Sequence, residues 1–258
     1  MFIHYRTLGF VIKKIDRGEA DRVFIIFTKD FGKLRLLARA ARKIKSKLSG
    51  GLKLFSLSEI EFIQGKAYKT LTDAKTRENF DKIPKSLIRL KIAYKIAEVS
   101  DKLLREEEKD QQIWNLFSET FQRLNSGSRL PYFPSHQILT AGLQGRKFLG
   151  FTIYYYFFWN LIDLIGYRPS VYNCAVCQKK LTLNCLYFNP EEGGVICSNC
   201  YKKLKSGKEI SADLVKILRV ILKKDWKTFC RIKIKPSHYK ALKNISNEYY
   251  NFLVQDFR

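Results

Sequence analysis

Four of the six cysteines are spaced so that they could share one metal ion. Two residues separate Cys174 from Cys177 and Cys197 from Cys200, and 19 residues lie between the pairs. Each pair offers two thiolates within bonding distance of one ion, so the spacing predicts tetrahedral coordination of one Zn²⁺ by all four. Because four protein ligands leave no open position, we expect a structural metal. An iron site, or disulfides in an oxidised compartment, are the alternatives.

The residues around these pairs complete the expected metal-binding insertion. Apolar residues and the turn-like sequence EEGG at 191–194 predict a small hairpin between the pairs. Cys185 and Cys230 lie outside the spacing, and we expect both to be small buried apolar residues.

The sequence offers little for catalysis. It contains only three histidines and has no GxxxxGK[ST], HExxH or GxSxG motif. Glu106, Glu107 and Glu108 fit a solvated helix end better than a nuclease centre. We therefore expect the protein not to be an enzyme.

Charge is the strongest signal in the composition. The chain has 48 Lys and Arg against 24 Asp and Glu, a formal net charge of +24. Residues 1–80 carry 18 basic and 8 acidic side chains, residues 81–200 carry 15 and 11, and residues 201–258 carry 15 and 5. Such an imbalance predicts a polyanionic partner, either nucleic acid or an anionic membrane surface. The hydrophobic content of 46% excludes a disordered basic tail.

The densest basic run lies between residues 33 and 53, where cations alternate with Leu34 and Leu36. One face of a strand there could be core while the other offers cations to a phosphate backbone. A solvated surface is the alternative. The candidate DNA contacts are Lys33, Arg35, Arg39, Arg42, Lys43, Lys45 and Lys47. Phe31, Phe55 and Tyr68 could stack on bases, although core packing is the more common role of such side chains.

The elements that must position these residues fall into two groups. Gly-containing turns separate five short strands, expected at residues 6–13, 23–28, 33–38, 56–63 and 68–72. Such strands predict a small closed sheet. After Pro84 a helical period begins, with helices expected over 87–104, over 111–124, through the aromatic run 148–167, and after the N-caps Ser211 and Ser237.

The aromatic run is nearly long enough to span a bilayer, but it contains Asn160 and Asp163. A helix packed on all sides by protein explains it better. The first residues contain no export signal. We therefore expect a soluble, cytoplasmic protein in which cysteines stay reduced and can bind metal.

Several motifs resemble the RecO family of bacterial recombination mediators and DNA-annealing proteins. The most specific are GEADR from Gly18, FTKDFGK from Phe27 and ARAARKIKSKL from Ala38. The segment LIDLIGYRPSVYNCAVC from Leu161 resembles the family's approach to its zinc motif. The resemblance covers essentially the whole chain. Ala40 and Ile44 depart from it, since Gly and Pro are frequent at these positions.

The resemblance implies an α+β protein with an OB-fold over residues 1–80 and a helical domain over 81–258, carrying the zinc-binding insertion at about 171–203. It implies binding of single- and double-stranded DNA and annealing of complementary strands. With RecR, and in some settings RecF, such proteins help RecA to replace single-strand-binding protein on DNA. By position it selects Arg35, Arg39, Arg42, Lys43, Lys45 and Lys47 as DNA contacts, in a protein associated with the nucleoid.

Three other classes share some of these features. A zinc-ribbon RNA-binding or ribosome-associated factor would have the same charge and cysteines. A peripheral membrane protein would place its basic ends on anionic lipid. A zinc-dependent nuclease would need an open coordination position, which four thiolates do not leave.

Overall fold

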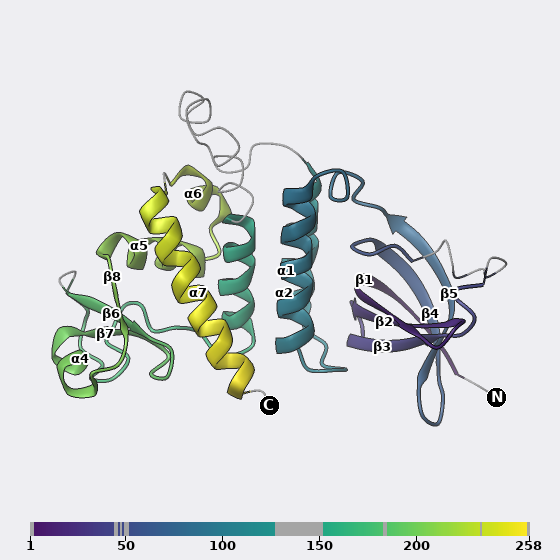
Figure 1. The fold of residues 1–258 in the computed structure, drawn as a ribbon, viewed down its shortest axis with the longest axis horizontal. Coiled ribbons are helices and arrows are strands. Elements are labelled where there is room, and N and C mark those ends of the chain that lie inside the picture. Colours follow the sequence, from purple (N-terminus) through teal and green to yellow (C-terminus); the bar gives the residue numbers. More distant parts are fainter. Residues whose placement is uncertain are drawn as a thin grey trace. The chain divides into compact units, whose positions relative to one another are not determined.

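The structure is a computed structural model in which residues 3–43, 46, 48, 52–126, 152–182, 185–232 and 234–256 are described. The chain forms two compact units, Met1–Gly127 and Ser128–Arg258. The first contains the barrel strands and two helices, and the second contains the remaining helices and a small sheet (Figure 1).

Five strands form a closed barrel in the order β1-β2-β3-β5-β4. The strands are β1 (His4–Arg17), β2 (Asp21–Thr28), β3 (Gly32–Ala38), β4 (Leu57–Gln64) and β5 (Lys69–Glu78). Neighbours pair antiparallel except at the closure, where β3 and β5 run parallel through Leu36↔Lys69 and Leu37↔Thr70. The order is that of an OB-fold, and it confirms the expected five-stranded closed sheet.

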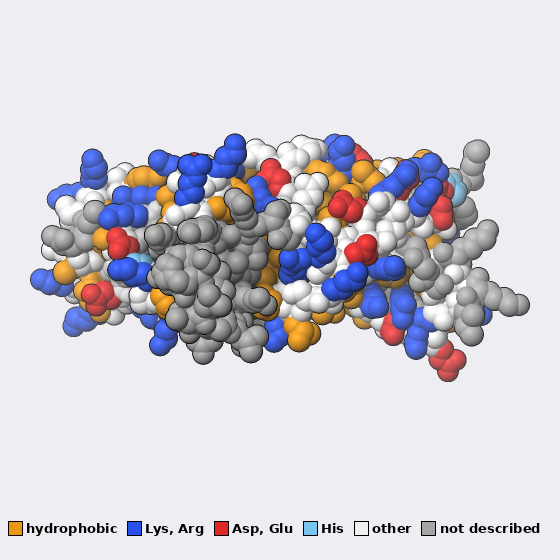
Figure 2. Space-filling view, turned by 90° about the horizontal axis from the view of Figure 1, so that it is seen from above, with side chains coloured by type: hydrophobic (Ala, Val, Ile, Leu, Met, Phe, Trp, Pro, Cys, Tyr) orange, Lys and Arg blue, Asp and Glu red, His pale blue; other side chains and the backbone are white. Residues whose placement is uncertain are grey.

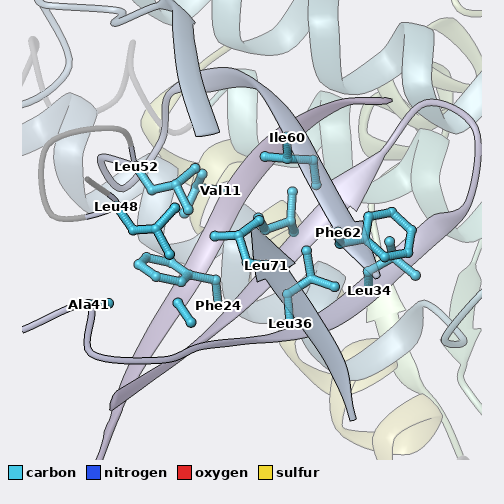
Figure 3. Packing of buried hydrophobic residues seen from close by; sticks show 12 residues of the cluster. Val11, Phe24, Leu34, Leu36, Ala41, Leu48, Leu52, Ile60, Phe62 and Leu71 are labelled. Atoms are coloured by element: carbon cyan, nitrogen blue, oxygen red, sulfur yellow. The ribbon is translucent and has the colours of Figure 1, made fainter. Parts of the chain in front are cut away.

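Alternating side chains fill the barrel. Along β4, Ser58, Ile60 and Phe62 are buried while their neighbours are partly exposed, which is the period of two expected of a strand with one face inward. Ile60 and Phe62 belong to the same buried cluster as Val11, Phe24 and Leu71 (Figure 3). The barrel interior is therefore a packed core and not a channel.

Two helices pack on the outside of the barrel: α1 (Leu87–Leu103) and α2 (Gln111–Ser126). The Phe27 and Phe117 rings stack with centroids 4.6 Å apart, and Phe10 lies 5.0 Å from Trp114. These contacts explain why the first compact unit continues to residue 127. The domain boundary expected between residues 80 and 81 therefore lies between the barrel strands and α1, whereas the first compact unit ends at Gly127.

The segment between α1 and α2 is fixed to the start of β3. The Glu107 amide donates to the Lys33 carbonyl oxygen at 2.9 Å. Gly32 has a φ of +64°, and a Cβ there would lie 2.2 Å from the Glu108 carbonyl oxygen. Only glycine allows both this backbone conformation and this close approach.

The aromatic run forms a buried helix over residues 152–164 in the second unit. Its Trp159 ring stacks on Tyr249 with centroids 5.6 Å apart and donates from Nε1 to the Ser246 hydroxyl at 3.0 Å. Further helices of this unit are α5 (Ala212–Leu222), α6 (Trp226–Arg231) and α7 (Pro236–Asp256). Within the described residues, no helix is long and apolar enough to cross a membrane.

One of the two expected helix caps is confirmed. The Ser211 hydroxyl accepts from the Leu214 amide at 3.2 Å and caps α5. The expectation for Ser237 is wrong, because α7 begins one residue earlier at Pro236. Proline is favoured in the first turn, where its fixed φ suits the helix and its missing N–H leaves no bond unmade.

The second unit contains a three-stranded sheet of order β7-β6-β8, and Cys197 is the last residue of its strand β7. The sheet consists of β6 (Leu186–Asn189), β7 (Gly194–Cys197) and β8 (Lys208–Ile210), with α4 (Ser198–Leu204) between β7 and β8. The expected hairpin is therefore present, and β8, which the sequence did not reveal, extends the metal-binding region to residues 170–210. Cys185 is exposed and not buried as expected; it lies directly before β6, outside the strand, and adopts a φ of +50°.

Candidate metal centre and nucleic-acid interface

The first cysteine pair lies in a tight backbone turn. The Cys174 amide donates to the Lys179 carbonyl oxygen at 2.8 Å, and the Gln178 amide donates to the Cys174 carbonyl oxygen at 2.9 Å. Gln178 adopts a φ of +59°, which reverses the chain after Cys177. The turn brings the two thiols of this pair to the same side.

The second pair is placed by the junction of β7 and α4. Cys197 is the last residue of β7, and Cys200 lies in the first turn of α4. The Cys197 amide donates to the Cys174 Sγ at 3.4 Å, which ties the two pairs together.

The four thiols converge on one point. The Sγ atoms of Cys174, Cys177, Cys197 and Cys200 all lie within 4.8 Å of one another, and those of Cys177 and Cys197 are 3.9 Å apart. Tetrahedral ligands with bonds of about 2.3 Å to zinc are about 3.8 Å from each other. The cluster therefore has the size needed to hold one metal ion.

The thiols differ in acidity. Burial tends to raise the pKa of Cys174, but the backbone amides of Cys177, Cys197 and Val176 outweigh it and lower the pKa to about 6. Burial and hydrogen bonds with the neighbouring cysteines raise the pKa of Cys200 to about 12. A coordinated cation deprotonates its thiol ligands outright, so metal binding would remove this difference.

Backbone bonds from outside the hairpin support the cluster. The Ser170 amide donates to the Gly193 carbonyl oxygen at 2.9 Å, and the Val195 amide donates to the Ser170 carbonyl oxygen at 2.8 Å. A Cβ on Gly194 would lie 2.5 Å from the backbone of Ser170, so glycine is required for this approach. The Tyr187 and Tyr201 rings stack and join β6 to α4.

A second candidate site lies on the barrel, where three segments meet. They are the β1–β2 turn with its flanks (residues 16–22), the segment after β3 (39–43) and the β4–β5 turn (65–68), which together we name the basic end. The Arg42 amide donates to the Ala20 carbonyl oxygen at 2.9 Å, and Arg42 Nη1 donates to the Gly18 carbonyl oxygen at 2.8 Å. Arg17 Nη2 donates to the Tyr68 hydroxyl at 3.1 Å and so reaches the third segment.

Positive charge predominates at the basic end. Arg39, Arg42 and Lys43 are exposed. Among the residues that the structure describes, neither Arg39 nor Lys43 has a carboxylate within ion-pair distance. Asp16 is shared by two cations: it accepts from Arg22 Nε at 2.7 Å and lies 3.8 Å from Arg42 Nε. The hydrogen bond from Arg22 lowers the pKa of Asp16, which therefore stays ionised.

The backbone at Ala40 shows why glycine is frequent at this position in proteins of the family. Ala40 adopts a φ of +52°, in the left-handed region that favours glycine. Its amide donates to the Asp21 Oδ1 at 2.8 Å, which holds the turn in place. Ile44, the other departure, lies outside the described residues, as do Lys45 and Lys47.

Lys33 differs from its expected place on the solvent face of β3. Its side chain is buried, with 6% of the residue exposed, and its ammonium donates to the Asp101 carbonyl oxygen at 2.7 Å. The expectation of exposure is wrong because the end of α1 covers the start of β3. Burial lowers the pKa of Lys33.

Arg35 is exposed as expected, but it has a carboxylate partner. Its Nε lies 3.3 Å from the Glu106 Oε1, and Glu107 forms a close ion pair with Lys69. Two of the three glutamates interpreted as a solvated helix end therefore neutralise cations of the barrel. The cations at the basic end lie outside these pairs.

The three candidate aromatic residues have different surroundings. Phe55 is buried and packs edge-on against Tyr94, with centroids 4.9 Å apart. Phe31 is partly buried between Tyr5 and Phe62. Tyr68 remains 49% exposed. Of the three, Tyr68 is the one whose ring is open to solvent to a large extent.

Sequence reasoning missed the contribution of the β1–β2 turn. Residues 16–21 were expected only to form a turn between strands, whereas Asp16 contacts Arg42 and Arg17 contacts Tyr68 in the other two segments. The alternation of charge within DRGEADR was the available signal. Figure 2 shows Lys and Arg side chains on the surface of each unit, with Asp and Glu side chains among them.

Comparison with known proteins decides the family. The family model for the recombination protein O N terminal matches residues 1–80, and the model for its C terminal matches residues 149–258. The chain belongs to the RecO family. Members of this family are DNA repair and recombination proteins. The N-terminal match covers the barrel strands, and the C-terminal match contains the four-cysteine cluster.

Curated RecO proteins match most of the chain. The DNA repair protein RecO of Dehalococcoides mccartyi (strain CBDB1) is 33% identical over 234 residues, which covers 89% of this chain and 83% of that protein. The DNA repair protein RecO of Roseiflexus sp. (strain RS-1) is 28% identical and covers 97% of this chain and 81% of its own. That of Halalkalibacterium halodurans is 25% identical over 96% of this chain and 89% of its own.

Proposed function

We propose that this RecO protein binds single- and double-stranded DNA at the basic end of its barrel and anneals complementary strands. The observation that carries the proposal is the convergence of Arg17, Arg39, Arg42 and Lys43 at one end of an OB-fold barrel. Lys33 is left out because its ammonium is buried. Lys45 and Lys47 belong to the proposal on the sequence alone.

Annealing needs no covalent chemistry. Base pairing supplies the free energy, and the protein has to reduce the repulsion between two polyanions. We propose that the barrel holds one strand and that the second unit, where residues 201–258 carry 15 basic and 5 acidic side chains, holds the other. The proposed domains are accordingly a nucleic-acid-binding OB-fold over 1–80 and a helical domain over 81–258.

A triple variant tests the interface. Replacing Arg39, Arg42 and Lys43 by Ala should weaken DNA binding and make it less sensitive to salt. Each lost phosphate contact lowers the slope of log K against log salt by about 0.7–0.9, so three contacts lower it by about 2–3. Titration of labelled single-stranded and duplex DNA at several salt concentrations measures the slope.

The matched control removes the same charge elsewhere in the first unit. Lys85, Lys91 and Lys102 are exposed on or next to α1, and their replacement by Ala should leave the salt dependence close to that of the parent. If the two triple variants behave alike, net charge and not the basic end determines binding. A parent-like slope in the first variant would refute the interface.

We propose zinc as the metal of the four-cysteine cluster. Four thiolates at tetrahedral spacing are the usual ligands of a structural Zn²⁺, and a site closed by four ligands holds the fold without taking part in a reaction. Elemental analysis of protein purified under reducing conditions should give one zinc per chain. Iron, or no metal, would refute the assignment.

The proposed partners follow the family. We propose that the protein acts in the cytoplasm, on nucleoid DNA, with RecR and in the RecF pathway, where it helps RecA to replace single-strand-binding protein. Strand annealing measured on bare DNA and on DNA coated with the cognate single-strand-binding protein tests this role. The protein should accelerate annealing of both substrates, and failure on the coated strand would refute the mediator function.

An RNA-binding or ribosome-associated role is the alternative, because the charge and the cysteines suit it equally. Competition between DNA and RNA oligonucleotides of one sequence and length, at matched salt, separates the two. Preference for DNA, or equal binding, fits the proposed role, whereas a strong preference for RNA would favour the alternative.

A further inference from the structure

The β4–β5 turn presents one aromatic ring at the basic end. Tyr68 is the last residue of this turn, directly before β5, and 49% of it is exposed. The Gly65 amide donates to the Tyr68 carbonyl oxygen at 3.1 Å, and a Cβ on Gly65 would lie 2.5 Å from that oxygen. The turn is therefore tight, and it fixes the backbone from which the ring projects.

An arginine lies over this ring. The Arg17 guanidinium carbon is 4.5 Å from the centroid of the Tyr68 ring, and Arg17 Nη2 donates to the Tyr68 hydroxyl at 3.1 Å. The two contacts orient the ring by its face and by its hydroxyl, although the two residues are 51 positions apart. Half of the tyrosine stays exposed with the guanidinium in place, so a flat ligand still has a surface on which to stack.

The residues around Tyr68 indicate which kind of ligand could bind there. Arg39, Arg42 and Lys43 are exposed on the segment that contacts the same β1–β2 turn, so a polyanion held there runs close to the tyrosine. Unpaired bases of a single strand offer their flat faces for stacking, whereas duplex bases are already stacked on each other. A single strand therefore fits the site, because its phosphates can contact the cations while a free base stacks on the tyrosine.

We infer that Tyr68, oriented by Arg17, is a base-stacking platform that lets this protein distinguish single-stranded from duplex DNA. The inference rests on the proposed DNA-binding function and adds to it a site for the base. The cations contact phosphates in both kinds of DNA, and the tyrosine contacts a base only in the single strand. A strand held this way keeps its bases accessible to a complementary strand.

Substitution of Tyr68 tests the platform. Tyr68→Leu should weaken binding of a thymidine oligonucleotide by about 5- to 150-fold, which corresponds to the 1–3 kcal/mol of one base–aromatic stack, and should leave duplex affinity within about twofold. Tyr68→Phe keeps the ring and should retain most of the single-strand affinity. Tyr94→Leu is the matched control, since Tyr94 is 51% exposed on α1 of the same unit. It should change neither affinity.

A crosslink gives a direct readout. An oligonucleotide with 5-iodouracil in place of thymine reacts under long-wavelength light with an aromatic ring stacked on it, and mass spectrometry of the product should identify Tyr68. Parent-like single-strand binding by Tyr68→Leu would overturn the inference. Equal loss for single-stranded and duplex DNA would also overturn it, because the tyrosine would then serve only the shape of the basic end.

The triple variant separates the two proposals. If replacing Arg39, Arg42 and Lys43 weakens binding of both kinds of DNA while Tyr68→Leu has no effect, the interface stands and the stacking platform fails. If the triple variant binds like the parent at every salt concentration, the interface itself is wrong.

Discussion

The barrel and the metal-binding region (residues 170–210) are both small β-structures, but different interactions hold them together. The barrel closes five strands around a cluster of twelve buried hydrophobic residues (Figure 3). The metal-binding region has strands of four, four and three residues, and its four thiols converge within 4.8 Å. We expect stability to be spread over many apolar contacts in the first and, with the proposed metal bound, to depend most on four side chains in the second.

The largest effect is expected when the four-cysteine cluster is disrupted. Replacing Cys174 and Cys200 by Ser should abolish metal binding, which in isolated zinc-finger peptides is on the order of 10 kcal/mol or more. Hydrogen exchange followed by mass spectrometry should then show fast exchange of the amides of β6, β7 and β8 and unchanged protection in the barrel. Unchanged protection of the small sheet would mean that the metal does not hold it.

A core substitution tests the opposite case. Leu36 is fully buried in the barrel, and Leu36→Ala should lower the free energy of unfolding by about 2–5 kcal/mol through lost burial and a cavity. Urea denaturation measures this loss, and the metal content should stay at the level of the parent. A coupled loss of metal would show that the two structures do not stand independently.

A smaller effect of opposite sign is expected at Ala40. Because its φ of +52° is unfavourable for a residue with a Cβ, Ala40→Gly should stabilise the barrel by about 0.5–1 kcal/mol. Thermal denaturation measures the shift, and DNA affinity should not change. Destabilisation would mean that the alanine methyl group makes a contact of its own.

The smallest effect depends on pH. Burial holds the pKa of Lys33 below its ordinary value of 10.5, so between the lowered pKa and 10.5 the unfolded chain binds more protons there than the folded chain. The parent should therefore gain stability relative to Lys33→Met as the pH rises through that interval. Urea denaturation of both proteins from pH 7 to 10.5 measures the difference. A difference that stays flat or falls would contradict the burial of a charged ammonium.

Features that depend on nearby residues could be predicted from the sequence, and features that depend on distant segments could not. Cysteine spacing is local, so the metal ligands and the hairpin between them follow from it, and the alternation along β4 shows as a period of two. The burial of Lys33 depends on the end of α1, and the pairing of Arg35 depends on Glu106, 71 residues away. Contacts between segments so distant along the chain leave no periodicity in either one. The meeting of Arg17 with Tyr68 is of the same kind.

Closure of the barrel also determines what this part of the protein offers to other chains. Closure leaves little free strand edge, because each of β1 to β5 pairs with a neighbour on both sides, over a short stretch where β3 meets β5. In the small sheet the outer strands β7 and β8 have four and three residues, so each presents only a short edge. If the protein gathers along DNA as proposed, these short edges limit edge-to-edge aggregation at high local concentration.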